Sequence, residues 1–245
     1  MKHIAFYIVL ILFAFSSCKE ASFRDEADFG YSYIPKELDY WQEFEVDSIY
    51  YDDLSSPSTI DTTHFYIREY YESNFLDASG KENIRVEQYR KQNLSDSWSL
   101  YQVGSILINS NGFQRYFKDL RFLNLVFPVR EGLEWQGHAY IDAFEEASLE
   151  YLDPNRFDWS YEYSEVNIPY NNSNFSFDSC LLVLQIDEEN LFEKKYAKEI
   201  YARGVGLVEK EVMILETQAP PSAASFLERA ESGFIYKQSL IDYKH

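Results

Sequence analysis

Residues 40–50 read Tyr-Trp-Gln-Glu-Phe-Glu-Val-Asp-Ser-Ile-Tyr and alternate apolar with polar side chains. Successive side chains of a β-strand point to opposite faces of a sheet, so this period of two predicts a strand with one buried face. The same pattern, enriched in Tyr, Phe, Ile and Val, recurs in Thr63–Tyr70, Asn83–Arg90, Ser97–Val103 and Ser105–Ile108. Repeated strands with short breaks between them favour an antiparallel arrangement.

The breaks between these stretches carry turn residues. Ser, Pro, Asp, Asn and Gly gather in Leu54–Ser58, Asp77–Gly80 and Asn109–Gly112. The Asn111-Gly112 pair predicts a type I′ hairpin, because that turn needs positive φ at both central residues. The two glycines within Tyr201–Val208 predict a second hairpin.

Later stretches complete the predicted fold. Leu123–Phe127 is typical of a strand that Pro128 ends, and Tyr236–Tyr243 is typical of a last strand. Asp187–Glu199 fits a short helix or a pair of strands, and Phe226–Ala230 fits a helical turn. We expect one all-β or β-rich domain over residues 36–245, an antiparallel sheet with one or two short helices. A sandwich, a barrel and a curved half-barrel are all open.

The N-terminus has the pattern of a signal peptide. A basic start is followed by the apolar run Ile4–Phe15 and then by Ser16-Ser17-Cys18. The run is too short to span the hydrocarbon core of a bilayer, which takes about 20 residues. Residues 15–18 resemble the lipobox of bacterial lipoproteins. That resemblance implies that residues 1–17 are removed and that Cys18 carries acyl chains.

Residues 18–35 are then expected to form the lipidated N-terminus and a tether, whose second part docks on the domain. The protein is expected in the cell envelope, anchored to a membrane by lipid. The resemblance to bacterial lipoproteins favours the outer membrane, and the partial match of Lys19-Glu20 to a surface-export signal also makes the cell surface a candidate location.

Composition limits the partners and the redox chemistry. With 41 acidic and 22 basic residues, the chain carries a formal net charge of −19, which repels nucleic acid. If the anchor consumes Cys18, Cys180 has no partner within the chain. It lies in an apolar run, which predicts a buried free thiol and a fold without disulfides.

The sequence offers no catalytic set. The histidines His64, His138 and His245 lack the spacing of a zinc helix, and no calcium-binding loop is recognisable. We predict no catalytic residue, no metal and no cofactor. Trp135 and His138 are the best candidates for ligand binding, since an exposed Trp could stack on a sugar or a peptide. The alternative is that Trp135 plugs one end of the domain while the glycines make the turns, and we favour it because large aromatic side chains are mostly buried on average.

Several longer stretches resemble an uncharacterised lipoprotein family of Bacteroidota. They are Pro35 ahead of Tyr40-Trp41, Asp47–Tyr50, Asp61–His64, Leu125–Gly132 with Trp135 and Gly137, and Tyr201–Val208. The family implies no activity. The O-glycosylation motif of that phylum is similar to the sequences at Ser48 and Thr62, which makes these two residues candidates for modification.

Three functions are compatible with these patterns. The first is an envelope lipoprotein that binds a protein, a glycan or an apolar ligand. The second is a hydrolase of envelope or extracellular polymers that uses a pair of carboxylates. The third is a lipid or lipoprotein chaperone, which would need a hollow apolar half-barrel.

Overall fold

The structure is a computed structural model that describes residues 28–52, 59–118, 120–141, 159–219 and 224–244. Twelve antiparallel strands form one sheet in the order β6-β5-β4-β3-β2-β1-β12-β11-β10-β9-β8-β7. Nearly all neighbours in this order are also neighbours along the chain, so hairpins build most of the sheet. The strands are β1 (Trp41–Asp52), β2 (Thr59–Leu76), β3 (Glu82–Lys91), β4 (Ser99–Asn109), β5 (Gly112–Phe117), β6 (Leu120–Val126), β7 (Glu134–Gln136), β8 (Ser160–Asn171), β9 (Ser176–Glu189), β10 (Glu193–Ala202), β11 (Gly206–Glu216) and β12 (Ser232–Tyr243).

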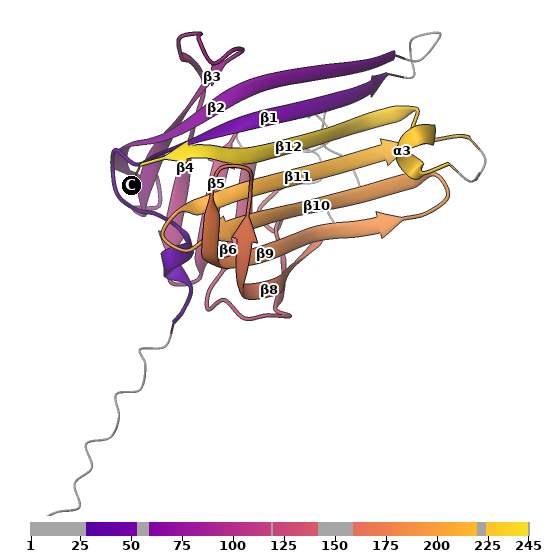
Figure 1. The fold of residues 1–245 in the computed structure, drawn as a ribbon. Coiled ribbons are helices and arrows are strands. Elements are labelled where there is room, and N and C mark those ends of the chain that lie inside the picture. The colour runs from indigo at the N-terminus through magenta and orange to yellow at the C-terminus, as the bar shows by residue number, and fades with distance from the viewer. Residues whose placement is uncertain (1–27, 53–58, 119, 142–158, 220–223, 245) are drawn as a thin grey trace, which may run out of the picture.

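The sheet curls into a nearly closed barrel, in which β4–β6 lie behind β1 and β10–β12 (Figure 1). Its two edges meet where β6 approaches the segment after β7. There the Leu123 amide donates to the Gly137 carbonyl at 2.8 Å, and the indole of Trp135 donates to the Leu123 carbonyl at 2.9 Å. Gly137 leaves room for the Tyr161 ring of β8 beside this contact, because a Cβ there would lie 2.3 Å from that ring. Of the three architectures left open, the structure selects the barrel.

Helical structure is limited to short turns in the described residues. A 3-10 turn, η1 (Tyr31–Tyr33), precedes the sheet, and α3 (Phe226–Arg229) precedes β12. The side chains of Ser225 and Glu228 cap the start of α3 reciprocally, which confirms the predicted helical turn. None of the described helices is long and apolar enough to cross a membrane.

Asp187–Glu199 forms a pair of strands, so the helical alternative was wrong. The end of β9 and the start of β10 pair through Tyr196 and Asp187, and the Asn190 side chain accepts from the amides of the turn between them. The burial along β10 alternates as in a strand: Lys195, Ala197 and Glu199 are buried, while Tyr196 and Lys198 between them are only half-buried.

The hairpin between β4 and β5 is present, but the reason given for it was wrong. Asn109 pairs with Gly112, so Ser110 and Asn111 are the central residues, and neither has a positive φ. The Asn109 side chain accepts from the amides of Asn111 and Gly112, at 2.8 and 3.1 Å, and fixes the turn. Gly112 is required for space, since a Cβ there would lie 2.4 Å from the Leu125 carbonyl oxygen.

The barrel interior is packed with large side chains. Phe44, Phe113, Leu125, Tyr163 and Tyr201 are all at most 2% exposed. Around them lie charged groups in pairs that bridge strands: Arg115 binds Glu69, and Lys210 binds Glu199 at 2.9 Å. A filled interior of this kind gives no support to the chaperone hypothesis, which needs a hollow barrel.

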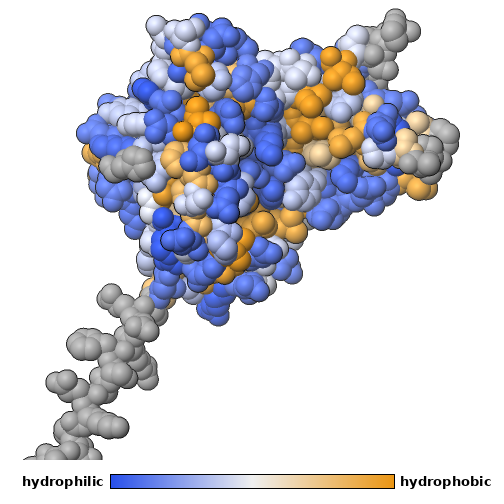
Figure 2. Space-filling view, viewed as in Figure 1, coloured by the Kyte–Doolittle hydropathy of each residue, from blue (hydrophilic) through white to orange (hydrophobic). Residues whose placement is uncertain are grey.

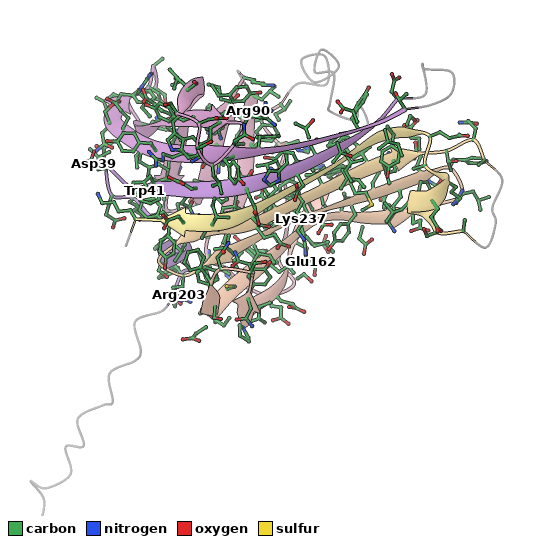
Figure 3. All side chains as sticks on the ribbon, turned by 45° about the horizontal axis from the view of Figure 1, so that its top comes forward. Asp39, Trp41, Arg90, Glu162, Arg203 and Lys237 are labelled. Atoms are coloured by element: carbon green, nitrogen blue, oxygen red, sulfur yellow. The ribbon has the colours of Figure 1, made fainter. Side chains whose placement is uncertain are left out.

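The first described residues dock on the end of the barrel. Tyr33 and Ile34 are 1% and 4% exposed, and Arg203 in the β10–β11 turn holds the segment from outside. Its guanidinium binds Asp28 at 2.7 Å, donates to the Ser32 hydroxyl at 2.5 Å and lies 4.6 Å from the centre of the Tyr33 ring. Arg203 therefore clasps the start of the domain, near the described N-terminal end (Figure 3).

Candidate functional site

The residues predicted as ligand contacts lie at the seam of the barrel, the place where β6 meets β7 and the segment after it. Trp135 on β7 is 9% exposed, and its ring packs against Tyr161 and Tyr163 with centroid distances of 5.9 and 4.5 Å. His138 is 4% exposed, and its Nε2 lies 3.2 Å from the Tyr161 hydroxyl. A stacking role needed an exposed indole, so the burial of Trp135 corrects that interpretation. The alternative role, a plug at one end of the domain, accounts for its contacts.

The other predicted site residues lie apart from this seam. Cys18 falls outside the described residues. Ser48 lies half-buried in the middle of β1, and Thr62 is exposed on β2, one register position away from it. Cys180 on β9 is fully buried, as predicted, and burial raises the pKa of its thiol to about 11. A thiol of that kind is inert rather than nucleophilic.

The outer face of β1–β3 carries a different set of aromatic residues. On β1 the residues Gln42, Phe44 and Val46 are buried inside the barrel, so the alternate positions face outward. Residues opposite one another on neighbouring strands share a face, which places the outward positions of β2 and β3 beside them. We call the resulting group the aromatic–cation strip. It comprises Trp41, His64, Tyr66, Arg68 and Lys91 on these strands, together with Trp98 from the β3–β4 connection, whose ring lies against Arg68 and Lys91.

Cations hold the indoles of this strip in place. The Arg68 guanidinium lies 5.4 Å from the Trp41 ring centre and 4.8 Å from that of Trp98. The ammonium of Lys91 lies 4.3 Å from the Trp98 ring and 5.7 Å from that of Tyr66. Glu43 in turn binds Arg68 in an ion pair. These contacts orient half-buried rings at the surface before any ligand arrives.

A polar hollow adjoins the strip on the same face. It has a volume of about 420 Å³ and lies under the tip of the β8–β9 hairpin, which passes in front of the sheet (Figure 1). We call it the asparagine groove; its walls are residues 170–174 of the hairpin tip with Glu45, Glu209, Lys237 and Ser239 of the sheet. Figure 2 shows hydrophilic and hydrophobic side chains interspersed over this face, with a larger hydrophobic area toward the ends of β1 and β12.

Three buried carboxylates among the described residues, Glu69, Glu199 and Glu209, are each paired with a cation. No group of three or more His, Cys, Asp or Glu within the described ranges could hold a metal. Glu69 and Glu199 face the packed interior and bind cations there. In the groove, Glu209 accepts from the Tyr170 hydroxyl and binds Lys198 at 3.0 Å, so it is already occupied.

Sequence reasoning missed Trp41, Trp98 and their cationic neighbours. Of the four tryptophans in the sequence, Trp135 was the predicted ligand contact, because it lies between Gly132 and Gly137. The signal that could have found the strip was the outward register, because the next three residues on the same face of β1 as Trp41 are the acidic Glu43, Glu45 and Asp47. Pairing Trp41 with Arg68 required knowledge of which strand lies beside β1.

The chain was compared with protein-family models, with curated proteins and with solved structures, and none of the three comparisons found a match. The functional proposal below therefore rests on the chemistry of the face itself.

Proposed function

We propose that this protein is a lipid-anchored protein of the bacterial cell envelope that binds uncharged glycans through the aromatic–cation strip. The observation that carries the proposal is the position of Trp41 and Trp98, half-buried on the outer face and held by Arg68. Such preoriented rings offer flat apolar surfaces to the C–H faces of sugars, and the polar groups around them suit hydroxyls.

Electrostatics favours an uncharged glycan over an acidic one. The strip holds Arg68 and Lys91, but Glu43 already neutralises Arg68, and the chain as a whole carries a charge of −19. A polyanion approaching the protein would meet that repulsive field. A neutral polymer would not, and it would still reach the rings.

The lipid anchor supports the envelope location. The lipobox resemblance at Cys18 implies several acyl chains, each buried methylene of which contributes about 0.8 kcal/mol to membrane affinity. A Cys18→Ser variant is therefore expected to carry no acyl chain. It should either remain unprocessed at the membrane through its uncleaved signal peptide or be cleaved elsewhere and enter the soluble fraction. Membrane retention and normal processing of that variant would contradict the anchor.

Glycan binding can be tested on the full-length protein purified in detergent. The probes are neutral polysaccharides (β-glucan, α-glucan, mannan, xylan and galactan), with alginate as an acidic comparison, and binding is read by affinity electrophoresis and calorimetry. Loss of a central aromatic contact costs about 2 kcal/mol, so Trp98→Ala should weaken binding by about 30-fold.

Tyr50→Ala provides the matched control. Tyr50 is 56% exposed and also lies on β1, but its position alternates with that of Trp41 and so faces the other side of the sheet. It should bind like the wild type. If none of the neutral polysaccharides retards the protein, glycan binding is rejected. If Trp98→Ala and Tyr50→Ala lose the same amount of affinity, the strip is rejected as the binding site.

A further inference from the structure

A straight cross-strand row connects the strip with the asparagine groove. Lys91 lies opposite Tyr66, Tyr66 opposite Glu45, Glu45 opposite Ser239 and Ser239 opposite Glu209. Paired residues point to the same face, so these five side chains form one outward line over β3, β2, β1, β12 and β11. Neighbouring strands are about 4.8 Å apart, so the row is about 19 Å long.

The groove end of this row is rigid. The Asn172 amide donates to the Leu240 carbonyl at 2.9 Å, and its own oxygen accepts from the amides of Asn174 and Phe175. These bonds tie the tip of the β8–β9 hairpin to β12 at a fixed height above the sheet. The hollow below it is therefore a feature of the folded chain and needs no rearrangement to form.

Two charged groups in the groove have no partner among the described residues. Lys237 is exposed on β12 and Glu45 is half-buried on β1, and neither side chain makes a hydrogen bond or ion pair within the described ranges. Figure 3 shows Lys237 midway along β12, beyond Trp41 at the end of β1. The groove thus offers a free donor and a free acceptor side by side.

Resting on the proposed glycan binding, we infer that the asparagine groove is a second subsite of the same glycan site. A linear, uncharged oligosaccharide would stack on the strip and continue along the row into the groove. There Lys237 donates to sugar hydroxyls and Glu45 accepts from them. A sugar hydroxyl both donates and accepts hydrogen bonds, so it matches this donor–acceptor pair.

The test is the dependence of affinity on oligosaccharide length. Full-length protein in detergent is titrated calorimetrically with a series of two to six residues derived from the polysaccharide that binds best. Affinity should rise at least tenfold along the series as the second subsite fills. In Lys237→Met and Glu45→Gln that rise should fall to about threefold or less, while the affinity for the shortest ligand stays within twofold of wild type.

Lys81→Met is the matched control. Lys81 is an exposed lysine in the β2–β3 turn, outside the strip and the groove, and its substitution should leave the length dependence unchanged. The side chains of Lys237, Glu45 and Lys81 make no hydrogen bond or ion pair within the described residues, so all three variants are expected to fold, which far-ultraviolet circular dichroism checks.

The outcomes separate the two proposals. If Trp98→Ala weakens glycan binding but Lys237→Met and Glu45→Gln leave the length dependence intact, the groove subsite alone is overturned. No binding at any length would overturn the glycan proposal itself. Release of reducing ends that Glu45→Gln abolishes would make the groove hydrolytic and overturn its role as a binding subsite.

Discussion

The carboxylate of Glu199 is buried inside the barrel and held there in its ionised form. Burial by itself would raise its pKa, but the nearby Lys210 ammonium, 2.9 Å away, and the Tyr201 hydroxyl, which donates at 2.5 Å, outweigh that effect. The result is a pKa of about 2 in the folded chain, against an ordinary value of 4.5. This depressed pKa links the stability of the barrel to pH.

The size and direction of the pH effect on stability follow from the difference between the folded pKa of Glu199 and its ordinary value. A lowered folded-state pKa contributes stability that is fully present above the ordinary value of 4.5 and is lost as the pH falls toward 2. The difference corresponds to about 3 kcal/mol at pH 7, and about half of it is lost by pH 3. A Glu199→Gln variant keeps hydrogen-bonding groups but no charge, so we expect it to be less stable than the wild type by about 2–3 kcal/mol at pH 7.

Urea denaturation between pH 7 and pH 3, followed by tryptophan fluorescence, measures this directly. The difference in unfolding free energy between wild type and Glu199→Gln should narrow by about half toward pH 3. Glu45→Gln, which removes a carboxylate without a partner, should show a small and constant difference. If the unfolding free energies of wild type and Glu199→Gln differ by less than 0.5 kcal/mol, or if their difference does not change with pH, Glu199 is not a buried stabilising charge.

The remaining predictions concern the seam, the thiols and the N-terminal clasp. Gly137→Ala places a Cβ 2.3 Å from the Tyr161 ring and should destabilise the barrel by about 2 kcal/mol in thermal unfolding; an unchanged melting temperature would show that the seam can relax. Thiol titration should find no reactive Cys180 in the native protein and one thiol per chain in urea, whereas two thiols would mean that Cys18 is free. Arg203→Met should speed hydrogen exchange of the amides at residues 31–34 by more than tenfold without changing that of β11, and equal rates would show that the clasp is dispensable.

The positions of the aromatic residues show how far a sequence pattern reaches. Alternation along residues 40–50 located β1 and its buried face, because side-chain direction in a strand depends only on the neighbouring residues. It also fixed Trp41 on the outward face. The residues that lie beside Trp41 on this face depend on which strands pair and in which register. The pairing of β1 with β12, for example, joins residues that are far apart in the chain.

The difference between local pattern and strand pairing also explains two predictions that the structure corrected. Trp135 has glycine neighbours that suggested an exposed loop, yet the closure of the barrel between β6 and β7 buries it. The Asp187–Glu199 stretch has a mixed pattern, and it became two strands because β9 and β10 each had a partner to pair with. Local preference is weak for such segments, so the surrounding sheet decides.

Four features could be predicted from the amino-acid sequence: the β-rich class, most strand positions, the buried free thiol at Cys180 and the expected anchor at Cys18. These depend on periodicity, composition and a short local motif. The closure of the sheet into a nearly closed, filled barrel, and the common face of Trp41, Trp98 and the asparagine groove, became visible only in the folded chain. Those features arise from register and closure, which are set by the packing of the whole sheet rather than by any one segment.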